Sequence, residues 1–210
     1  MNVYDFDKTI YPTDCTIDFG FWCMNRHPKM WFTFFPRMIG ICIKYKMGII
    51  PEYLMHRNFF QYLTMVDDLD ELIKLYWDKN EKRIAPWYLK QKKDDDLIIS
   101  ASPTCIIEPI ANRLGVRFVA SEFDTKYGVF TNNLMYAKEK ARYIIEQGFP
   151  LIENVYSDSL SDTPIALLGE KAHLVSHRAT KISDWPKLDR DTMKVVKKKI
   201  DVGWKVHIKN

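Results

Sequence analysis

Two carboxylates stand near the start of the chain, two residues apart. Asp5 and Asp7 follow Val3 and Tyr4, a short apolar run typical of a β-strand, and Thr9 comes two residues later. Alternate side chains of a strand share a face, so we expect both aspartates to leave the strand end toward one site. Two anionic groups so close repel each other unless a cation lies between them. A hard dication that prefers oxygen ligands is the obvious candidate.

A second polar group follows the apolar run at residues 97–99. Ser100 comes directly after that run, and Ser102 and Pro103 predict a helix with Ser102 as N-cap and Pro103 in its first position. A hydroxyl at Ser100, beside free backbone N–H groups, could hold a phosphate oxygen. The alternative is that Ser100 only shapes the turn before the helix.

Two lysines lead the helix predicted at residues 138–147. Lys138 and Lys140 place positive charge at a helix N-terminus, where it opposes the helix dipole. This unfavourable position indicates a functional role, although a solvated surface lysine is the alternative. The two side chains are two residues apart and point in different directions, so we expect only one of them in the site.

A second pair of carboxylates follows the strand predicted at residues 155–156. Asp162 could cap the next helix, which begins at Thr163 and Pro164. Asp158 follows the strand too closely to be explained by capping alone. A third carboxylate beside Asp5 and Asp7 would complete a magnesium site.

The elements around these residues predict an α/β fold. Apolar residues recur three and four apart through residues 14–94, which indicates a block of helices. From residue 95 on, short apolar strands alternate with helices, a pattern typical of a doubly wound, mostly parallel sheet with helices on both faces. We therefore expect a core of residues 1–13 plus 95–210 with an inserted all-α cap of residues 14–94. Binding sites in such sheets lie at the carboxyl ends of the strands, where all these residues fall.

Composition narrows the function. The chain has 210 residues, of which 47% are hydrophobic and 28% charged, with a net charge of +4. This mild positive balance suits an anionic substrate, and no basic stripe indicates nucleic-acid binding. The cysteines form no zinc-binding pattern, no signal peptide is evident and no apolar run is long enough to span a membrane. We expect a cytoplasmic protein with reduced thiols.

The polar segments also carry a family resemblance. Taken in order, Asp5-Phe-Asp-Lys-Thr, the strand before Ser100, the helix-leading lysine and the Ser-Asp-Ser-Leu-Ser-Asp run at 157–162 resemble the four motifs of the haloacid-dehalogenase-like (HAD) phosphohydrolases. The resemblance covers nearly the whole chain. It is closest to the phosphoserine-phosphatase-like branch, in which a helical cap lies between the first and second motifs, where this chain has residues 14–94.

The resemblance implies a mechanism for the two leading aspartates. Asp5 would be the nucleophile and would form an aspartyl-phosphate. Asp7 would protonate the leaving group and then activate the hydrolytic water. Mg²⁺ would be held by the Asp5 carboxylate, the backbone carbonyl of Asp7 and Asp158.

The resemblance implies roles for the remaining polar residues as well. Ser100 and one lysine would bind the phosphoryl oxygens, and Asp162 would orient the site from behind. The family pattern of a lysine followed four positions later by an apolar residue selects Lys140, with Lys138 as the runner-up. The complete prediction is: catalytic Asp5, Asp7, Ser100, Lys140 and Asp162; substrate-binding Thr9, Ser100, Ala101, Lys138 and Asp14; metal-binding Asp5, Asp7 and Asp158.

Two positions leave questions open. Ser157 stands where family members often have glycine, which leaves the geometry of that loop undecided. Asp14 stands where phosphoserine-specific relatives place an acidic residue that meets the substrate amine, but it could equally cap the first helix of the insert.

Substrate and partners follow from the insert. We expect a Mg²⁺-dependent phosphomonoester hydrolase acting on a small phosphorylated metabolite. The aromatic residues close together between Phe19 and Phe35 are typical of a packed helical core. They could alternatively give weak contact with a membrane surface, as in a phospholipid-phosphate phosphatase. A phosphotransferase and a non-catalytic phosphate-binding HAD protein are further alternatives.

Overall fold

The centre of the protein is a mostly parallel sheet. The computed structural model describes residues 1–204, and within them a six-stranded sheet has the order β3-β2-β1-β6-β7-β8. Every neighbouring pair is parallel except β7 and β8, which are antiparallel. A separate antiparallel pair, β4 with β5, forms a hairpin where the sequence predicts a turn near residues 126–128. The strands are β1 Asn2–Tyr4, β2 Leu97–Pro103, β3 Arg117–Ser121, β4 Phe123–Asp124, β5 Val129–Phe130, β6 Ile152–Ser157, β7 Gly169–Ser176 and β8 Lys181–Asp184.

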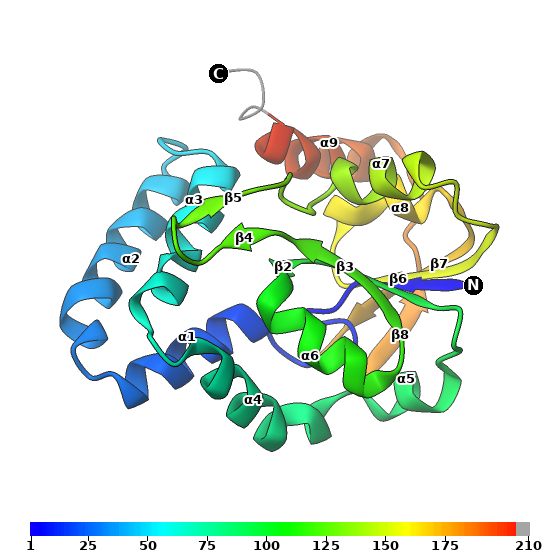
Figure 1. The fold of residues 1–210 in the computed structure, drawn as a ribbon. Helices are drawn as coiled ribbons and strands as arrows, with labels where there is room; N and C mark the ends of the chain where they lie inside the picture. Colours follow the sequence, from blue (N-terminus) through cyan, green and yellow to red (C-terminus); the bar gives the residue numbers. More distant parts are fainter. Residues whose placement is uncertain (205–210) are drawn as a thin grey trace.

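Helices cover both faces of this sheet. Helix α6 lies on one face with α4 and α5, and α7, α8 and α9 lie on the other (Figure 1). The predicted doubly wound α/β fold is thereby confirmed. The helices are α1 Cys15–Arg26, α2 Met30–Lys46, α3 Glu52–Phe59, α4 Leu69–Asn80, α5 Pro86–Gln91, α6 Thr104–Leu114, α7 Lys138–Glu146, α8 Thr163–Ala166 and α9 Arg190–Trp204, with 3₁₀ turns η1 Phe60–Met65, η2 Glu81–Arg83 and η3 Leu160–Asp162.

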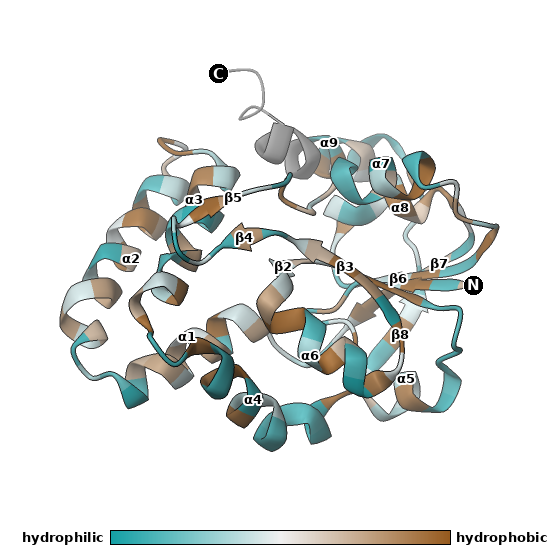
Figure 2. Cartoon of the chain, viewed as in Figure 1, coloured by the Kyte–Doolittle hydropathy of each residue, from teal (hydrophilic) through white to brown (hydrophobic). Residues whose placement is uncertain are grey.

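Successive side chains of β1 pack into two different hydrophobic clusters, one on each face of the sheet. Val3 packs with Leu97 and Val155 in the cluster under α7 and α8, whereas Tyr4 belongs to the cluster on the α6 side. Tyr4 stacks on Tyr156 of β6, with ring centroids 4.9 Å apart. Both helical layers present apolar residues inward and polar residues outward, as the striping of α6 and α7 shows (Figure 2). The buried strand β1 therefore holds the residues that follow it in a fixed position.

The predicted start of α6 is wrong. β2 continues through Pro103, which has an extended backbone (φ −61°, ψ 140°), and the helix begins at Thr104. Ser102 is therefore a strand residue, and its hydroxyl is used elsewhere. The sequence also predicts that this helix stops at Gly115, which is confirmed, because Gly115 adopts the left-handed conformation (φ 65°) that glycine allows at a helix terminus.

The C-terminal third differs from prediction in three places. The sequence predicts that the helix beginning at Thr163 stops at Gly169, but α8 ends at Ala166 and Gly169 begins β7. The edge strand β8 was not predicted, and α9 occupies the tail for which no structure was predicted. Residues 205–210 of the predicted core lie outside the described part of the chain.

The insert of residues 14–94 is helical, as predicted, throughout its regular elements. Helices α1, α2 and α3 extend beyond the sheet, whereas α4 packs against α6 (Figure 1). Trp77 of α4 is buried, and its Nε1 donates to the carbonyl of Ile106 at 2.8 Å. The boundaries of a cap domain at residues 14–94 stay a prediction. No helix of the described residues is long and apolar enough to cross a membrane.

Candidate active site

A cavity of about 400 Å³ opens where β1 ends, between the sheet and the helical insert. Asp5 and Asp7 both line it, as the alternation of side chains predicted. The Asp5 amide donates to the Tyr156 carbonyl at 2.9 Å, which extends the pairing of β1 with β6 by one residue. Phe6, between the two aspartates, is fully buried in the core. The backbone of Asp5 is thus anchored by both the sheet and the core.

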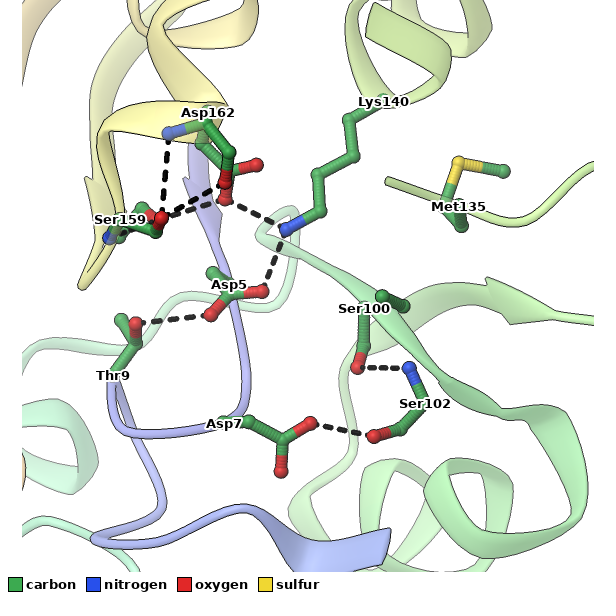
Figure 3. A network of polar contacts seen from close by, with 12 residues as sticks. Asp5, Asp7, Thr9, Ser100, Ser102, Met135, Lys140, Ser159 and Asp162 are labelled. Carbon is green, nitrogen blue, oxygen red and sulfur yellow. Dashed lines mark hydrogen bonds and ion pairs between the residues drawn. The ribbon is translucent and has the colours of Figure 1, made fainter. Parts of the chain in front are cut away.

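The Asp5 carboxylate is held on both of its oxygens (Figure 3). Lys140 Nζ lies 2.6 Å from Oδ1, and Thr9 Oγ1 donates to Oδ2 at 3.1 Å. Burial raises the pKa of Asp5, an effect that the charge of Lys140 opposes. Thr9 is fully buried. A carboxylate fixed in this way presents a defined oxygen to the cavity.

Lys140 is the lysine that enters the site. Its ammonium contacts Asp162 Oδ2 at 2.7 Å as well as Asp5, and its side chain is only 3% exposed. Burial lowers the pKa of Lys140, but the charges of Asp162 and Asp5 outweigh it and leave the pKa above its ordinary value. The lysine is therefore a buried cation with two carboxylate partners. Lys138, at the start of the same helix, is exposed and does not line the cavity.

Asp162 positions Lys140 instead of capping a helix. It occupies the N-cap position of α8, but its side chain makes no capping hydrogen bond. Its Oδ2 accepts from Lys140 and, at 2.8 Å, from Ser157 Oγ. Ser157, which stands where the family often has glycine, thus contributes a hydrogen bond to the buried network. Ser157 Oγ also accepts the Ser159 amide at 3.1 Å and so helps to shape the loop.

Asp7 has a different set of partners. The Cys15 amide, in the first turn of α1, donates to its Oδ1 at 2.6 Å, and Ser102 Oγ donates to its Oδ2 at 2.6 Å. Thr16 Oγ1 in turn donates to Ser102 Oγ at 2.8 Å. Burial raises the pKa of Asp7 to about 7, and the charges of Asp14 and Asp5 add to the rise. Near neutral pH this carboxyl can both hold and release a proton.

In the segment after Ile99, the residue expected at the phosphate, Ser100, does not line the cavity. Ala101 and Ser102 line the cavity, as does Thr16 from α1. Ser100 is completely buried, and its Oγ accepts the Ser102 amide at 3.1 Å. A phosphate contact by Ser100 stays a prediction. Ser102 was interpreted as a helix cap and its role at Asp7 was missed, because a Ser-Pro pair also fits the end of a strand.

Asp158 lines the same cavity as Asp5. Burial and the charges of Asp5 and Asp162 raise the pKa of Asp158 to about 7. The buried carboxylate of Asp5 and the half-buried one of Asp158 disfavour each other's charge, and together they provide a donor set that fits a hard dication. Within residues 1–204 no cluster of three His, Cys, Asp or Glu side chains has metal-binding geometry. The predicted magnesium site thus needs the backbone oxygen of Asp7 as its third protein ligand, and the ligand set stays a prediction.

Asp14 caps α1. Its Oδ1 accepts the Ile17 amide at 3.0 Å, as the alternative interpretation of this residue expected. Asp14 also lines the cavity, and its contact with a substrate amine stays a prediction.

The insert supplies one wall that the sequence did not predict. Glu52 and His56, one turn apart on α3, line the cavity, together with Tyr45 of α2 and Tyr136 from the loop before α7. Glu52 is buried and lies 3.6 Å from His56 Nε2. Nothing in the spacing of these residues marks them, because their convergence depends on how α2 and α3 pack together.

Comparison with known proteins identifies the family. The sequence model of the haloacid dehalogenase-like hydrolases matches residues 3–167, which include both leading aspartates, Lys140 and Asp162. The chain belongs to this family. No curated protein sequence matches it.

Solved structures agree on the fold of this HAD hydrolase. A protein of unknown function from Bordetella pertussis Tohama I is 15% identical with a TM-score of 0.69, covering 82% of this chain and 87% of its own. A probable phosphoserine phosphatase from Vibrio cholerae is 10% identical with a TM-score of 0.62, covering 100% and 67%. A phospho-aspartyl intermediate analogue of phosphoserine phosphatase is 15% identical with a TM-score of 0.53, covering 81% and 83%. These likenesses show a HAD-like α/β fold of the phosphoserine-phosphatase type.

Proposed function

We propose that the protein is a Mg²⁺-dependent phosphomonoester hydrolase that acts through an aspartyl-phosphate on Asp5. The observation that carries this proposal is the pair Asp5 and Asp7 in one cavity, with different partners. Asp5 is held by Lys140 and Thr9, whereas Asp7 has a pKa raised to about 7 by burial. One carboxylate suits a nucleophile and the other suits an acid–base group. The solved phospho-aspartyl analogue of phosphoserine phosphatase supports the same chemistry in a related fold.

The first step would transfer the phosphoryl group to the protein. An oxygen of Asp5 bonds to phosphorus while the ester P–O bond breaks, and the carboxyl group of Asp7 gives its proton to the departing oxygen. Ser102 and the Cys15 amide hold the Asp7 carboxyl in place through its two oxygens. Lys140 lies where its positive charge can offset negative charge on the phosphoryl oxygens.

The second step would restore Asp5. Asp7, now a carboxylate, takes a proton from water as the water oxygen bonds to phosphorus. The bond between phosphorus and Asp5 breaks, and inorganic phosphate leaves. The same residue thus acts first as an acid and then as a base, for which a pKa near neutrality is suited.

The residues fit a magnesium ion at one side of this cavity. The carboxylates of Asp5 and Asp158 and the backbone carbonyl of Asp7 would hold it. When bound, Mg²⁺ supplies positive charge that lowers the repulsion between the anionic nucleophile and the phosphate.

Hydrolysis of 4-nitrophenyl phosphate tests the proposal. With Mg²⁺ present we expect release of 4-nitrophenol, and with excess EDTA we expect the rate to fall by at least about 100-fold, because a dication contributes several kcal/mol to such reactions. Addition of Mg²⁺ beyond the EDTA should restore the rate. A rate that EDTA leaves unchanged would contradict the magnesium requirement.

The hydrogen bond from Ser102 to Asp7 gives a further prediction. A hydrogen bond to a charged group is worth about 1.5–3 kcal/mol, so Ser102→Ala should lower kcat by about 10-fold or more. The loss should appear in kcat more than in KM, since Ser102 acts on the substrate through Asp7. Steady-state kinetics would measure it, with Ser183→Ala on the exposed strand β8 as the matched control. An unchanged kcat would remove Ser102 from this role.

A further inference from the structure

An apolar groove lies next to the candidate active-site cavity. It has a volume of about 340 Å³ and runs between α1 and α2. Phe21 and Met24 of α1 form one side, and Phe34, Phe35 and Met38 of α2 form the other. In the part of the chain that the structure describes, Lys46 is the one charged residue in its lining. The rest of the lining is apolar except for the Cys42 thiol, so the groove is suited to an apolar group more than to a phosphate or a sugar.

The groove adjoins the cavity that holds the two aspartates. Ile17 of α1, Cys42 of α2 and Phe59 of α3 line both of them. The lining of the cavity thus includes carboxylates and a lysine as well as three side chains that it shares with the groove. A molecule bound with its phosphate beside Asp5 would lie in a cavity that borders the apolar groove.

The outer edge of the groove is incompletely covered. Ile39 and Ile43, one helical turn apart on α2, are 48% and 52% exposed and both line the groove. Brown segments recur along α2 (Figure 2), the helix that supplies these two side chains. Removing such surface from water is favourable by about 25 cal/mol for each Å². The groove is therefore suited to an apolar chain that covers these side chains.

We propose that this groove holds an apolar tail of the substrate, so that the substrate is an amphiphilic phosphomonoester. The inference rests on the proposed function, because it places the phosphate end at Asp5. The three side chains that line both the groove and the cavity, Ile17, Cys42 and Phe59, are the observation that assigns the groove to the substrate. A soluble amphiphile and a membrane lipid with a phosphate headgroup share this chemistry.

A series of alkyl phosphates tests the inference. Ethyl, hexyl and decyl phosphate, each below its micelle concentration, would be compared by kcat/KM. A fully buried methylene changes affinity by about fourfold, and we expect about twofold per methylene in this partly open groove. Equal kcat/KM values for ethyl and decyl phosphate would overturn the inference while leaving the proposed hydrolase intact.

A pair of variants locates the effect. The double variant Ile39→Gln/Ile43→Gln places amides in the groove and should lower the decyl-to-ethyl ratio of kcat/KM by at least about 10-fold. Phe32→Gln is the matched control, because Phe32 is 83% exposed on the same helix and lines neither the groove nor the cavity. We expect the wild-type ratio in this control. If Phe32→Gln lowered the decyl-to-ethyl ratio as much as the groove variant does, the preference for decyl phosphate would come from adsorption to the protein surface. That result would contradict groove binding.

Binding without turnover separates this inference from the proposed mechanism. Calorimetric titration of the Asp5→Asn variant with ethyl and decyl phosphate should give tighter binding of decyl phosphate, and the groove substitutions should abolish the difference. Equal affinities would overturn the inference even if no substrate is hydrolysed. A separate assay with phosphatidate in phosphatidylcholine vesicles distinguishes the two kinds of substrate. Hydrolysis of phosphatidate would identify the substrate as a membrane lipid, whereas hydrolysis of monomeric decyl phosphate alone would identify it as a soluble amphiphile.

Discussion

Asp5→Asn is expected to lower kcat by at least about 10⁴-fold, because the amide cannot form the proposed acyl phosphate. The effect should be the largest of any single substitution in the site. Asn keeps the shape of the side chain, and Lys140 keeps Asp162 as its buried partner at 2.7 Å. The variant should therefore stay folded. Release of 4-nitrophenol at saturating substrate and Mg²⁺ measures the loss, and circular dichroism confirms the fold.

The matched control makes the same chemical change elsewhere. Asp184 ends the exposed edge strand β8, so Asp184→Asn removes a strand-end carboxylate that does not line the cavity. Its kcat should stay within about twofold of wild type, as is usual for surface substitutions. If Asp5→Asn retained more than a few per cent of the wild-type rate, Asp5 would not be the nucleophile.

Lys140→Ala is expected to lower kcat/KM by about 10³-fold and to destabilise the protein as well. The lysine lies 2.6 Å from Asp5 and 2.7 Å from Asp162, and removal leaves two buried carboxylates without their cation. Breaking a buried ion pair costs about 3–5 kcal/mol. Loss of one charged group at the phosphoryl oxygens accounts for the kinetic effect. Urea unfolding and steady-state kinetics measure the two effects separately.

Two further variants keep this prediction testable. Lys140→Met retains the aliphatic stem of the side chain and should keep more stability than Lys140→Ala while losing the same turnover. Lys138→Ala, on the same helix but exposed, should change stability by less than about 0.5 kcal/mol and kcat/KM by little. Equal and mild losses at both positions would remove both lysines from the site.

Residues whose place depends on local structure were predictable. Asp5 and Asp7 follow a strand directly, and the alternation of side chains places both in one cavity. Helix geometry predicts only that one of Lys138 and Lys140 enters the site, and the family pattern of a lysine followed four positions later by an apolar residue selects Lys140. The parallel sheet could also be predicted, since strands alternating with helices have few other ways to bury their apolar faces.

Residues whose place depends on packing or on ambiguous signals were not predictable. The pair Ser102 and Pro103 fits a helix start and also the end of a strand, because proline keeps the preceding residue extended. Only the approach of Asp7 to Ser102 decides between them. Glu52 reaches the cavity through the packing of α3, which leaves no local pattern in the sequence.

The turn before β8 could not be predicted either, because its sequence lacks the usual turn residues. His177, Arg178 and Ala179 all have positive φ, between 52° and 63°, although none of them is glycine or asparagine. The turn residues that normally announce such a conformation are missing, so the edge strand that follows was not foreseen. Antiparallel pairing with the preceding strand β7 stabilises the strand in spite of this.

Chemical trapping of the covalent intermediate tests the central claim most directly. The protein would be quenched during turnover and treated with borohydride, whose hydride displaces phosphate from an aspartyl-phosphate and reduces that carboxyl carbon to the alcohol of homoserine. Peptide mass spectrometry then locates the reduced residue. We predict homoserine at position 5 and none at position 7. Homoserine at another aspartate, or active turnover with no reduced residue, would contradict the assignment of Asp5 as the nucleophile.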